Sequence, residues 1–374
     1  MAEQRATESG MIETMDTPAK TKLEPSPTIR DSSTDRVFSV GIVGAGEIVS
    51  RTHLPVLTAC EGVRIEYVAD KNFEAARSVG SSYKLRPVTV ADDLDELPQT
   101  DIVLLAVPVI ARWPYYELFA KRGTSVLAEK PLVACISDAD HLCTLYPDYS
   151  LACGFQRRTY GSVALAKLLV AEKWFGSLRS VSVSEGALTT KTGADSRFYD
   201  DAAAGGGVLM DLGCHSLDVA MYIGNAFRAI PVKQRFVYDR GVDREVEAHL
   251  TLITADGECD LDYFVSWLQP ARNTVELRFE NCVLSLSCRP SQDIEILGRK
   301  DRSGNDQVSN HSGAPPMLTA KCGGAATVYQ AFYLEWMAFL HGIRTQQASK
   351  LSARSCLPTI RAVEDLYRAG KLNP

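Results

Sequence analysis

The sequence predicts an α/β protein in two parts: a doubly wound parallel sheet, then an α/β domain with a large open, mainly antiparallel sheet. From residue 37 onward, apolar strand-like runs alternate with helix-like segments, as in a parallel sheet covered by helices on both faces. Residues 101–107 form a nearly continuous apolar run, which is typical of a strand buried on both sides. The second half carries longer runs of alternating polar and apolar residues, which favour a sheet with one solvated face.

In the first half, strands are expected where β-branched and other apolar residues cluster: residues 37–43, 63–69, 86–90, 101–107, 125–128 and 151–154. Helices are expected between them, at residues 47–60, 72–79, 112–121 and 137–145. This βαβα order predicts parallel strands joined by helical crossovers.

The second half begins with a helix at residues 162–174 and a further, largely apolar helix that starts near Gly205. Strands are then expected at residues 178–185, 232–238, 245–254, 258–267, 274–279, 282–288 and 293–297, together forming the open sheet. Residues 300–324 are rich in Gly, Ser, Asn and Pro, which indicates a long loop. Two helices, at residues 326–346 and 352–369, close the chain.

Composition excludes several classes of protein. The chain has 374 residues, 45% hydrophobic and 23% charged, with a net charge of −6, so no basic surface points to nucleic acid or to anionic lipid. No apolar run is long enough to cross a bilayer. The ten cysteines show no C-x-x-C spacing, and Cys214 has no second sulfur at metal-ligand spacing, so we expect reduced thiols, a cytoplasmic location and no metal. Residues 1–36 are predicted to be a disordered tail rather than a secretory signal.

A glycine-rich turn follows the first strand. Gly44 allows a tight turn, and Gly46 lets the backbone approach a pyrophosphate at the start of a helix. The third glycine of the usual dinucleotide fingerprint is replaced by Val49, so the motif is incomplete. Asp70 ends the next strand. A carboxylate there can accept hydrogen bonds from the hydroxyls of the adenosine ribose and would repel a 2′-phosphate, which favours NAD over NADP. The competing interpretation is a tight turn and a surface Asp in a protein that binds something else.

A lysine stands at the end of the fifth predicted strand, in the sequence Glu129–Lys130–Pro131. Ligands of open α/β sheets bind beyond the carboxyl ends of the strands, so Lys130 is placed to reach one. A solvated lysine at a strand end is the plainer alternative.

The apolar helix after Gly205 carries three ionisable residues at i, i+4 and i+7: Asp211, His215 and Asp218. This spacing puts all three on one face of a helix that is otherwise apolar nearly all round. Buried carboxylates and an imidazole need partners or a function, so we expect proton chemistry here. A histidine satisfied within the core is the alternative for His215 taken alone.

The order of these motifs resembles the Gfo/Idh/MocA oxidoreductase family, which includes glucose–fructose oxidoreductase, inositol dehydrogenases and sugar ketoreductases. The resemblance runs from residue 37 to about residue 369 and includes Thr52–His53–Leu54–Pro55 between the glycine turn and the Glu-Lys-Pro motif. It implies a Rossmann domain at residues 37–155 and a substrate-binding and oligomerisation domain at residues 156–374, assembled into a homodimer or homotetramer.

The resemblance also implies roles for individual residues. Lys130 would hydrogen-bond the reacting oxygen, and Asp211 would orient the imidazole or contact a substrate hydroxyl. His215 would be the general acid/base, since the unperturbed pKa of a histidine lies near neutrality. Asp218 is expected to be structural, and His53 to cap or pack within the first helix. Cofactor contacts are expected from Gly44, Gly46, Glu47, Ile48, Asp70, Val107, Pro108, Glu129 and Lys130.

Substrate contacts are expected from Arg157, Arg158 and Tyr199. Two adjacent arginines suit an anionic substrate group. The alternative, equally weighted, is that one forms an interdomain salt bridge and the other is solvated.

The function expected from the resemblance is hydride transfer between NAD and a secondary alcohol or ketone of a sugar, cyclitol or nucleotide-linked sugar. One alternative is a relative with different chemistry: a C=C or C=N reductase, or an NAD-retaining glycosidase. The other is a non-catalytic NAD-binding regulatory protein.

Overall fold

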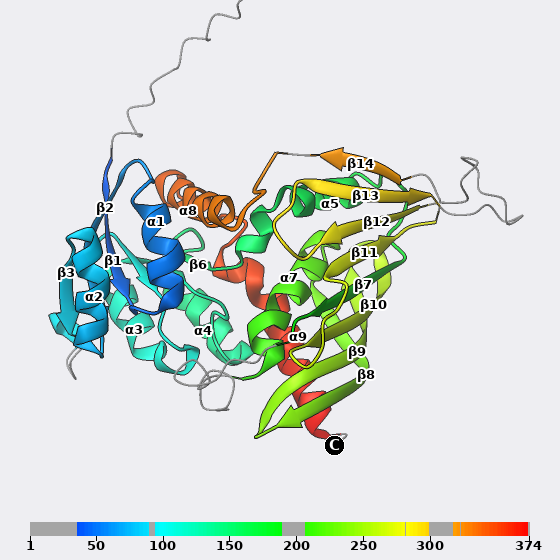
Figure 1. The fold of residues 1–374 in the computed structure, drawn as a ribbon, viewed down its shortest axis with the longest axis horizontal. Coiled ribbons are helices and arrows are strands. Elements are labelled where there is room, and N and C mark those ends of the chain that lie inside the picture. The colour runs from blue at the N-terminus through cyan, green and yellow to red at the C-terminus, as the bar shows by residue number, and fades with distance from the viewer. Residues whose placement is uncertain are drawn as a thin grey trace, which may run out of the picture. The chain divides into compact units, whose positions relative to one another are not determined.

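A six-stranded parallel sheet forms the first half of the chain in the computed structural model (Figure 1). The structure describes residues 36–89, 94–188, 206–280, 282–298, 317–321 and 323–372. The strands lie in the order β3-β2-β1-β4-β5-β6, and every pairing is parallel. Their bounds are β1 Phe38–Val43, β2 Val63–Asp70, β3 Arg86–Thr89, β4 Ile102–Leu105, β5 Ser125–Ala128 and β6 Leu151–Cys153. This is the doubly wound order of dinucleotide-binding sheets, and it confirms the predicted fold class.

Helices cover this sheet, and most lie where the sequence predicts them: α2 Phe73–Tyr83, α3 Trp113–Arg122 and α4 Ile136–Leu145. The adjacent strands β4 and β5 are buried along their whole length, as expected for strands covered on both faces. The helix predicted at residues 47–60 is shorter and irregular. It contains the π-helical turn η2 (Val49–His53) followed by α1 (Leu54–Leu57).

An eight-stranded mixed sheet forms the second half, in the order β14-β13-β12-β11-β7-β10-β9-β8. Strands β7 and β10 pair in parallel, and the remaining neighbours pair antiparallel. The bounds are β7 Ser180–Gly186, β8 Arg228–Asp239, β9 Val242–Thr254, β10 Gly257–Ser266, β11 Thr274–Arg278, β12 Cys282–Ser287, β13 Asp293–Gly298 and β14 Met317–Lys321. Strand β14 corrects the prediction of a loop throughout residues 300–324. It pairs with β13 through backbone hydrogen bonds, which composition does not reveal.

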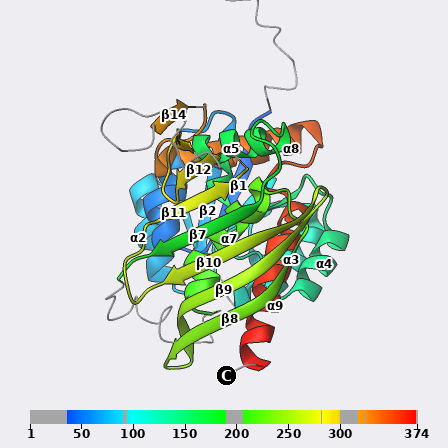
Figure 2. The ribbon, with the colours of Figure 1, turned by 90° about the vertical axis from the view of Figure 1, so that its right-hand side faces the viewer.

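One face of the second sheet packs on helices, and the other is open in the described structure (Figure 2). Strand β10 shows why: Leu261, Tyr263 and Val265 are buried, whereas Glu258, Asp260 and Asp262 alternate with them and are exposed. The covered face packs on α5 (Gly161–Ala171), α7 (Cys214–Ile223) and α9 (Ala353–Leu372). The predicted single solvated face is thus present.

The C-terminal helices contact both halves of the chain. Helix α8 (Val328–Thr345) packs on α1 and on the 3-10 helix η5 (Gln156–Thr159), whereas α9 packs on α4, α7 and β8. The chain passes from the first sheet to the second between β6 and β7. The division into domains at residues 155 and 156 stays a prediction, as does the tail, which lies outside the described residues. No helix in the described ranges is both long and apolar enough to span a membrane.

Candidate active site at the carboxyl edge of the parallel sheet

The glycine turn lies where β1 ends. Gly44 has a φ of 109°, and a Cβ there would lie 2.6 Å from the carbonyl oxygen of Ala106, so only glycine fits. A Cβ on Gly46 would have nothing within 4 Å, so this backbone faces open space. The turn therefore packs against the segment that contains Val107 and Pro108, and it leaves room for a pyrophosphate to approach the backbone. These residues fit a dinucleotide.

Asp70 fastens this turn to the end of β2. Its Oδ2 accepts a hydrogen bond from the amide of Ala45 at 2.8 Å, and its Oδ1 accepts one from the amide of Asn72 at 2.8 Å. Each carboxylate oxygen keeps a further lone pair that a ribose hydroxyl can use. The anchoring role was not anticipated from sequence, because it depends on which amides point toward the strand end.

The other residues predicted at the turn are more exposed. Glu47 forms a surface ion pair with Arg51 at 2.6 Å, and Ile48 is partly exposed. Their contact with a cofactor stays a prediction.

Arg112 holds the loop that carries Lys130 through hydrogen bonds. It is a buried residue that the sequence alone did not indicate. Its Nε donates to the carbonyl of Val107 at 2.8 Å, and its Nη1 donates to the carbonyls of Glu129 and Pro131. The guanidinium thus joins the segments that follow β4 and β5. No local sequence pattern signals this, since all three acceptors are backbone oxygens.

Glu129 supports Lys130 from the same side. Its Oε2 accepts a hydrogen bond from the Lys130 amide at 3.1 Å, and its Oε1 lies 2.8 Å from Nε2 of His53. Trp336 Nε1 lies 3.1 Å from His53 Nδ1. The indole N–H can only donate, so Nδ1 accepts and the imidazole proton is on Nε2, facing the carboxylate. Burial raises the pKa of Glu129, but the His53 hydrogen bond and nearby positive charge outweigh it and lower that pKa below its usual value.

Both carboxylate oxygens of Glu129 are bonded within the protein, so Glu129 supports Lys130, and its expected contact with the cofactor stays a prediction. His53 does not cap its helix, because its side chain bonds Glu129 and Trp336.

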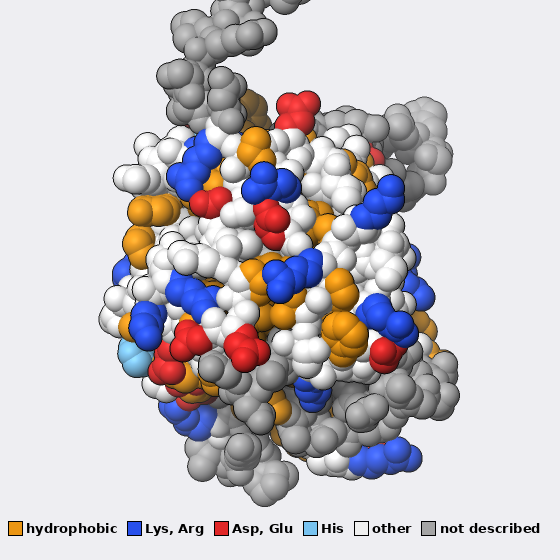
Figure 3. Space-filling view, turned by 90° about the vertical axis from the view of Figure 1, so that its left-hand side faces the viewer, with side chains coloured by type: hydrophobic (Ala, Val, Ile, Leu, Met, Phe, Trp, Pro, Cys, Tyr) orange, Lys and Arg blue, Asp and Glu red, His pale blue; other side chains and the backbone are white. Residues whose placement is uncertain are grey.

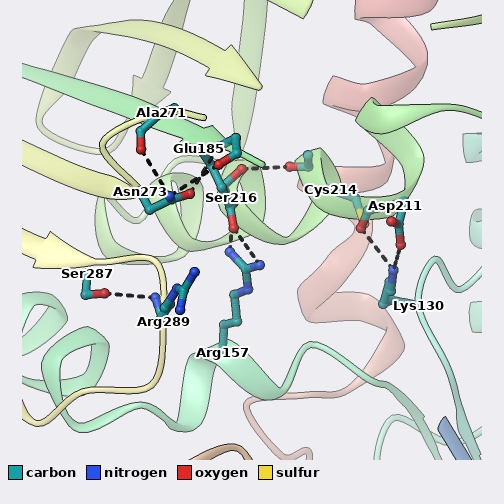
Figure 4. A network of polar contacts seen from close by, with 12 residues as sticks. Lys130, Arg157, Glu185, Asp211, Cys214, Ser216, Ala271, Asn273, Ser287 and Arg289 are labelled. Carbon is teal, nitrogen blue, oxygen red and sulfur yellow. Dashed lines mark hydrogen bonds and ion pairs between the residues drawn. The ribbon is translucent and has the colours of Figure 1, made fainter. Parts of the chain in front are cut away.

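Lys130 and Asp211 meet across the two halves of the chain (Figure 4). Lys130 Nζ lies 2.7 Å from Asp211 Oδ1 and 2.9 Å from the Asp211 carbonyl oxygen. Burial lowers the pKa of Lys130, but the charge of Asp211 outweighs it and raises that pKa above its usual value. The ammonium therefore stays charged in a largely enclosed position, with 16% of its side chain exposed.

Asp211 and His215 lie on one irregular helix, here called the site helix, formed by the π-helical turn η8 (Leu209–Gly213) and α7. His215 is buried, packs edge-on against Phe155 with ring centroids 5.9 Å apart, and has no hydrogen-bond partner at Nδ1 in the described structure. Burial, with the charges of Arg157 and Lys130, lowers the pKa of His215 well below its usual value. The imidazole is therefore neutral at pH 7, and its role as general acid/base stays a prediction.

The arginines are held by buried carboxylates. Arg157 donates from Nη1 and Nη2 to Glu185 at 2.9 and 2.8 Å, pointing toward β7 (Figure 4). Arg158 Nε lies 2.8 Å from Asp218, and its other nitrogens donate to Asp218, Ser355 and the Lys350 carbonyl. Neither is solvated, and both charges are balanced within the protein. The alternative of one solvated arginine is therefore wrong, whereas contact of Arg157 and Arg158 with an anionic substrate group stays a prediction.

Asp218 bonds Arg158 and Thr359, which fits its expected structural role. Tyr199 lies outside the described residues. Within those residues, no group of three or more His, Cys, Asp or Glu side chains could hold a metal ion.

Comparison with known proteins identifies the family. Residues 38–155 match the model of the oxidoreductase family with an NAD-binding Rossmann fold, and residues 163–300 match the Gfo/Idh/MocA C-terminal domain. The chain therefore belongs to the Gfo/Idh/MocA oxidoreductase family, as the order of motifs indicated.

Two curated relatives illustrate the range of substrates. The chain is 28% identical over 215 residues to dTDP-3,4-didehydro-2,6-dideoxy-alpha-D-glucose 3-reductase of Streptomyces violaceoruber, which covers 57% of this chain and 62% of that protein. It is 22% identical over 185 residues to inositol 2-dehydrogenase of Rhizobium meliloti, and the alignment covers 49% of this chain and 54% of that protein. The aligned regions thus span less than two thirds of either relative.

Solved structures share the fold over most of their length. An aldose-aldose oxidoreductase from Caulobacter crescentus, complexed with glycerol, has a TM-score of 0.74 at 20% identity, covering 91% of this chain and 99% of that one. A 3-ketoreductase from Actinomadura kijaniata, in complex with NADP and TDP-benzene, has a TM-score of 0.73 at 20% identity, covering 90% and 98%. GenD2 from gentamicin A biosynthesis, in complex with NAD, has a TM-score of 0.70 at 21% identity, covering 91% and 96%.

Proposed function

We propose that this protein is an NAD-dependent oxidoreductase that transfers a hydride between nicotinamide and a secondary alcohol or ketone of a sugar, cyclitol or nucleotide-linked sugar. The observation that carries the proposal is the Lys130–Asp211 pair, 2.7 Å between Nζ and Oδ1, beyond the carboxyl end of β5. Ligands of doubly wound sheets bind at this edge.

Each residue of the pair has a defined task. The ammonium of Lys130 donates to the oxygen of the reacting carbon and stabilises the negative charge that develops on it. Asp211 keeps that ammonium charged and holds it in position. The bound dinucleotide supplies the hydride acceptor or donor.

His215 is the base of the proposed reaction. Its imidazole is neutral, so in the direction of alcohol oxidation it accepts the hydroxyl proton rather than donating one. Its unpartnered Nδ1 is a site at which a proton can be held.

NAD is the proposed cofactor, because the ionised carboxylate of Asp70 stands at the end of β2, where a 2′-phosphate would meet its charge. Solved structures with this fold bind NAD or NADP, so the choice between the two cofactors is part of the experimental test below. The face that Figure 3 shows carries Lys and Arg interspersed with Asp and Glu among the described residues.

The nucleotide-linked sugars are included because the relative with 28% identity reduces one. The balanced arginines favour an uncharged reacting ring in any of these substrates, since neither offers a free charge. The homodimer or homotetramer and the cytoplasmic location stay predictions.

The test is a substrate screen of the purified chain. Neutral sugars, cyclitols and nucleotide-linked keto sugars are offered with NAD, NADH, NADP and NADPH while nicotinamide absorbance is followed. Turnover with NAD on at least one class supports the proposal. Cofactor binding without turnover on any class favours a regulatory protein, and substrate conversion without net change in nicotinamide favours the NAD-retaining chemistry.

A further inference from the structure

Asp243 lies at the start of β9 and reaches the turn from which the site helix begins. Its side chain is buried, with the residue 2% exposed. Oδ1 accepts a hydrogen bond from the Gly207 amide at 3.1 Å, and Oδ2 accepts one from the Leu209 amide at 2.9 Å. Amides in the first turn of a helix have no partner within the helix, so this carboxylate caps the site helix from a distant strand.

The glycines before the site helix explain how the strand comes so close. A Cβ on Gly207 would collide with the main-chain oxygen and the carboxylate of Asp243. Gly206 has a φ of 122°, in the region that side chains disfavour. The glycine run therefore accommodates Asp243.

Helix α9 holds the same carboxylate from its other side. The hydroxyl of Tyr367 donates to Asp243 Oδ1 at 2.9 Å. Asp243 thus connects the start of the site helix to β9 and α9.

A continuous series of hydrogen bonds leads from Asp243 to Asp211 and Lys130, here called the reacting pair. The Asp211 amide donates to the Gly207 carbonyl at 3.0 Å, so the residue that Asp243 holds is bonded directly to Asp211. Lys130 then bonds both the carbonyl and the carboxylate of Asp211. A shift of Gly207 therefore moves both acceptors of the lysine.

We propose that Asp243 is a positioning residue that holds Asp211 against Lys130 by capping the site helix. The inference rests on the proposed function only in taking Lys130 and Asp211 as catalytic. Its geometric content, that Asp243 controls the environment of Lys130, is independent of any substrate.

The first test measures Lys130 itself in the full-length chain without substrate. Reductive methylation of Lys130 is followed by mass spectrometry as a function of pH, because only the neutral amine reacts. Asp243→Asn keeps one acceptor oxygen but cannot accept from both amides. Loosening Asp211 lowers the pKa of Lys130, and each unit of that fall speeds labelling about tenfold at a fixed pH below the pKa.

Two reference variants calibrate the result. Asp211→Asn gives the full effect of losing the carboxylate beside Lys130. Asp260→Asn, on the exposed face of β10, is the matched control and should label as the unaltered chain does. Asp243→Asn is expected to fall between them.

Tyr367→Phe is the second test, because it removes only the hydroxyl that holds Asp243. It also tests the role of Asp243 if Asp243→Asn does not fold. We expect faster Lys130 labelling and, on the substrate found in the screen, a kcat lowered about tenfold or more with KM for NAD unchanged. Unaltered Lys130 labelling in Asp243→Asn and Tyr367→Phe, or in Tyr367→Phe alone if Asp243→Asn does not fold, overturns the inference. If no substrate is turned over, the proposed function fails while the labelling experiment still decides the role of Asp243.

Discussion

The ammonium of Lys130 and the carboxylate of Asp211 come from opposite halves of the chain and meet at 2.7 Å. Lys130 follows a strand of the parallel sheet, whereas Asp211 lies on a helix packed against the second sheet. The reacting pair therefore exists only when both halves are folded and correctly docked. This dependence connects the chemistry of the site to the buried contacts that hold the halves together.

Replacing Lys130 with Met should lower kcat about 10²- to 10³-fold, because the change removes the charge at the reacting oxygen. NAD binding, followed by titration calorimetry, should stay close to that of the unaltered chain, since the glycine turn is intact. Lys233→Met, on the exposed part of β8, is the control. Full turnover in Lys130→Met would contradict the role of the lysine.

Replacing Asp70 with Ser should reduce the preference for NAD over NADP, measured as the ratio of kcat/KM for the two cofactors. The variant should also bind NAD more weakly, because the Ala45 amide loses its acceptor. Asp70→Asn, which keeps an acceptor oxygen but no charge, separates the two effects. An unchanged cofactor ratio in both variants would place discrimination elsewhere.

His215 should make stability depend on pH in a defined direction. Its pKa is lowered in the folded chain from a usual value of 6.5, so the unfolded chain binds an extra proton below that pH. The free energy of unfolding should therefore fall as the pH drops below about 6.5, by up to about 1.4 kcal/mol per pH unit from this one proton. His215→Gln should show a shallower fall in urea titrations between pH 7 and 5. Identical slopes would mean that His215 is not buried as a neutral base.

Replacing Arg158 with Met should destabilise the fold by about 3–5 kcal/mol, because Asp218 would be left buried and unpaired. Arg64→Met breaks an exposed pair with Glu66 and should change the free energy of unfolding by less than about 1 kcal/mol. Urea unfolding of both variants makes the comparison. A cost for Arg158→Met as small as that of Arg64→Met would show that the buried pair contributes little.

Periodicity and motif order predicted the two sheets and the residues that form the reacting pair. Gly44, Lys130 and Asp211 were recognisable because each stands at the end of a strand or on a helix whose apolar pattern is strong. The partners of those residues were not recognisable. Arg112 acts through backbone carbonyls, and His53 meets Trp336 across most of the length of the chain.

The arginines show the same limit more sharply. From sequence, Arg157 and Arg158 are two adjacent positive charges with an expected substrate contact, whereas their carboxylate partners lie on β7 and the site helix. Which charge a carboxylate neutralises depends on packing between segments, and no local pattern encodes it. The depressed pKa of His215 likewise follows from burial that only the assembled fold creates.

The bond from Trp336 to His53 has a consequence for synthesis on the ribosome. The strands that bear the glycine turn and Lys130 are translated well before α8, which carries the indole that orients His53 and, through it, Glu129. A nascent chain stalled before α8 emerges would lack the hydrogen bond from Trp336 to His53. The support of Lys130 is thus complete only after the strands of the second sheet have been synthesised, because α8 follows them in the chain.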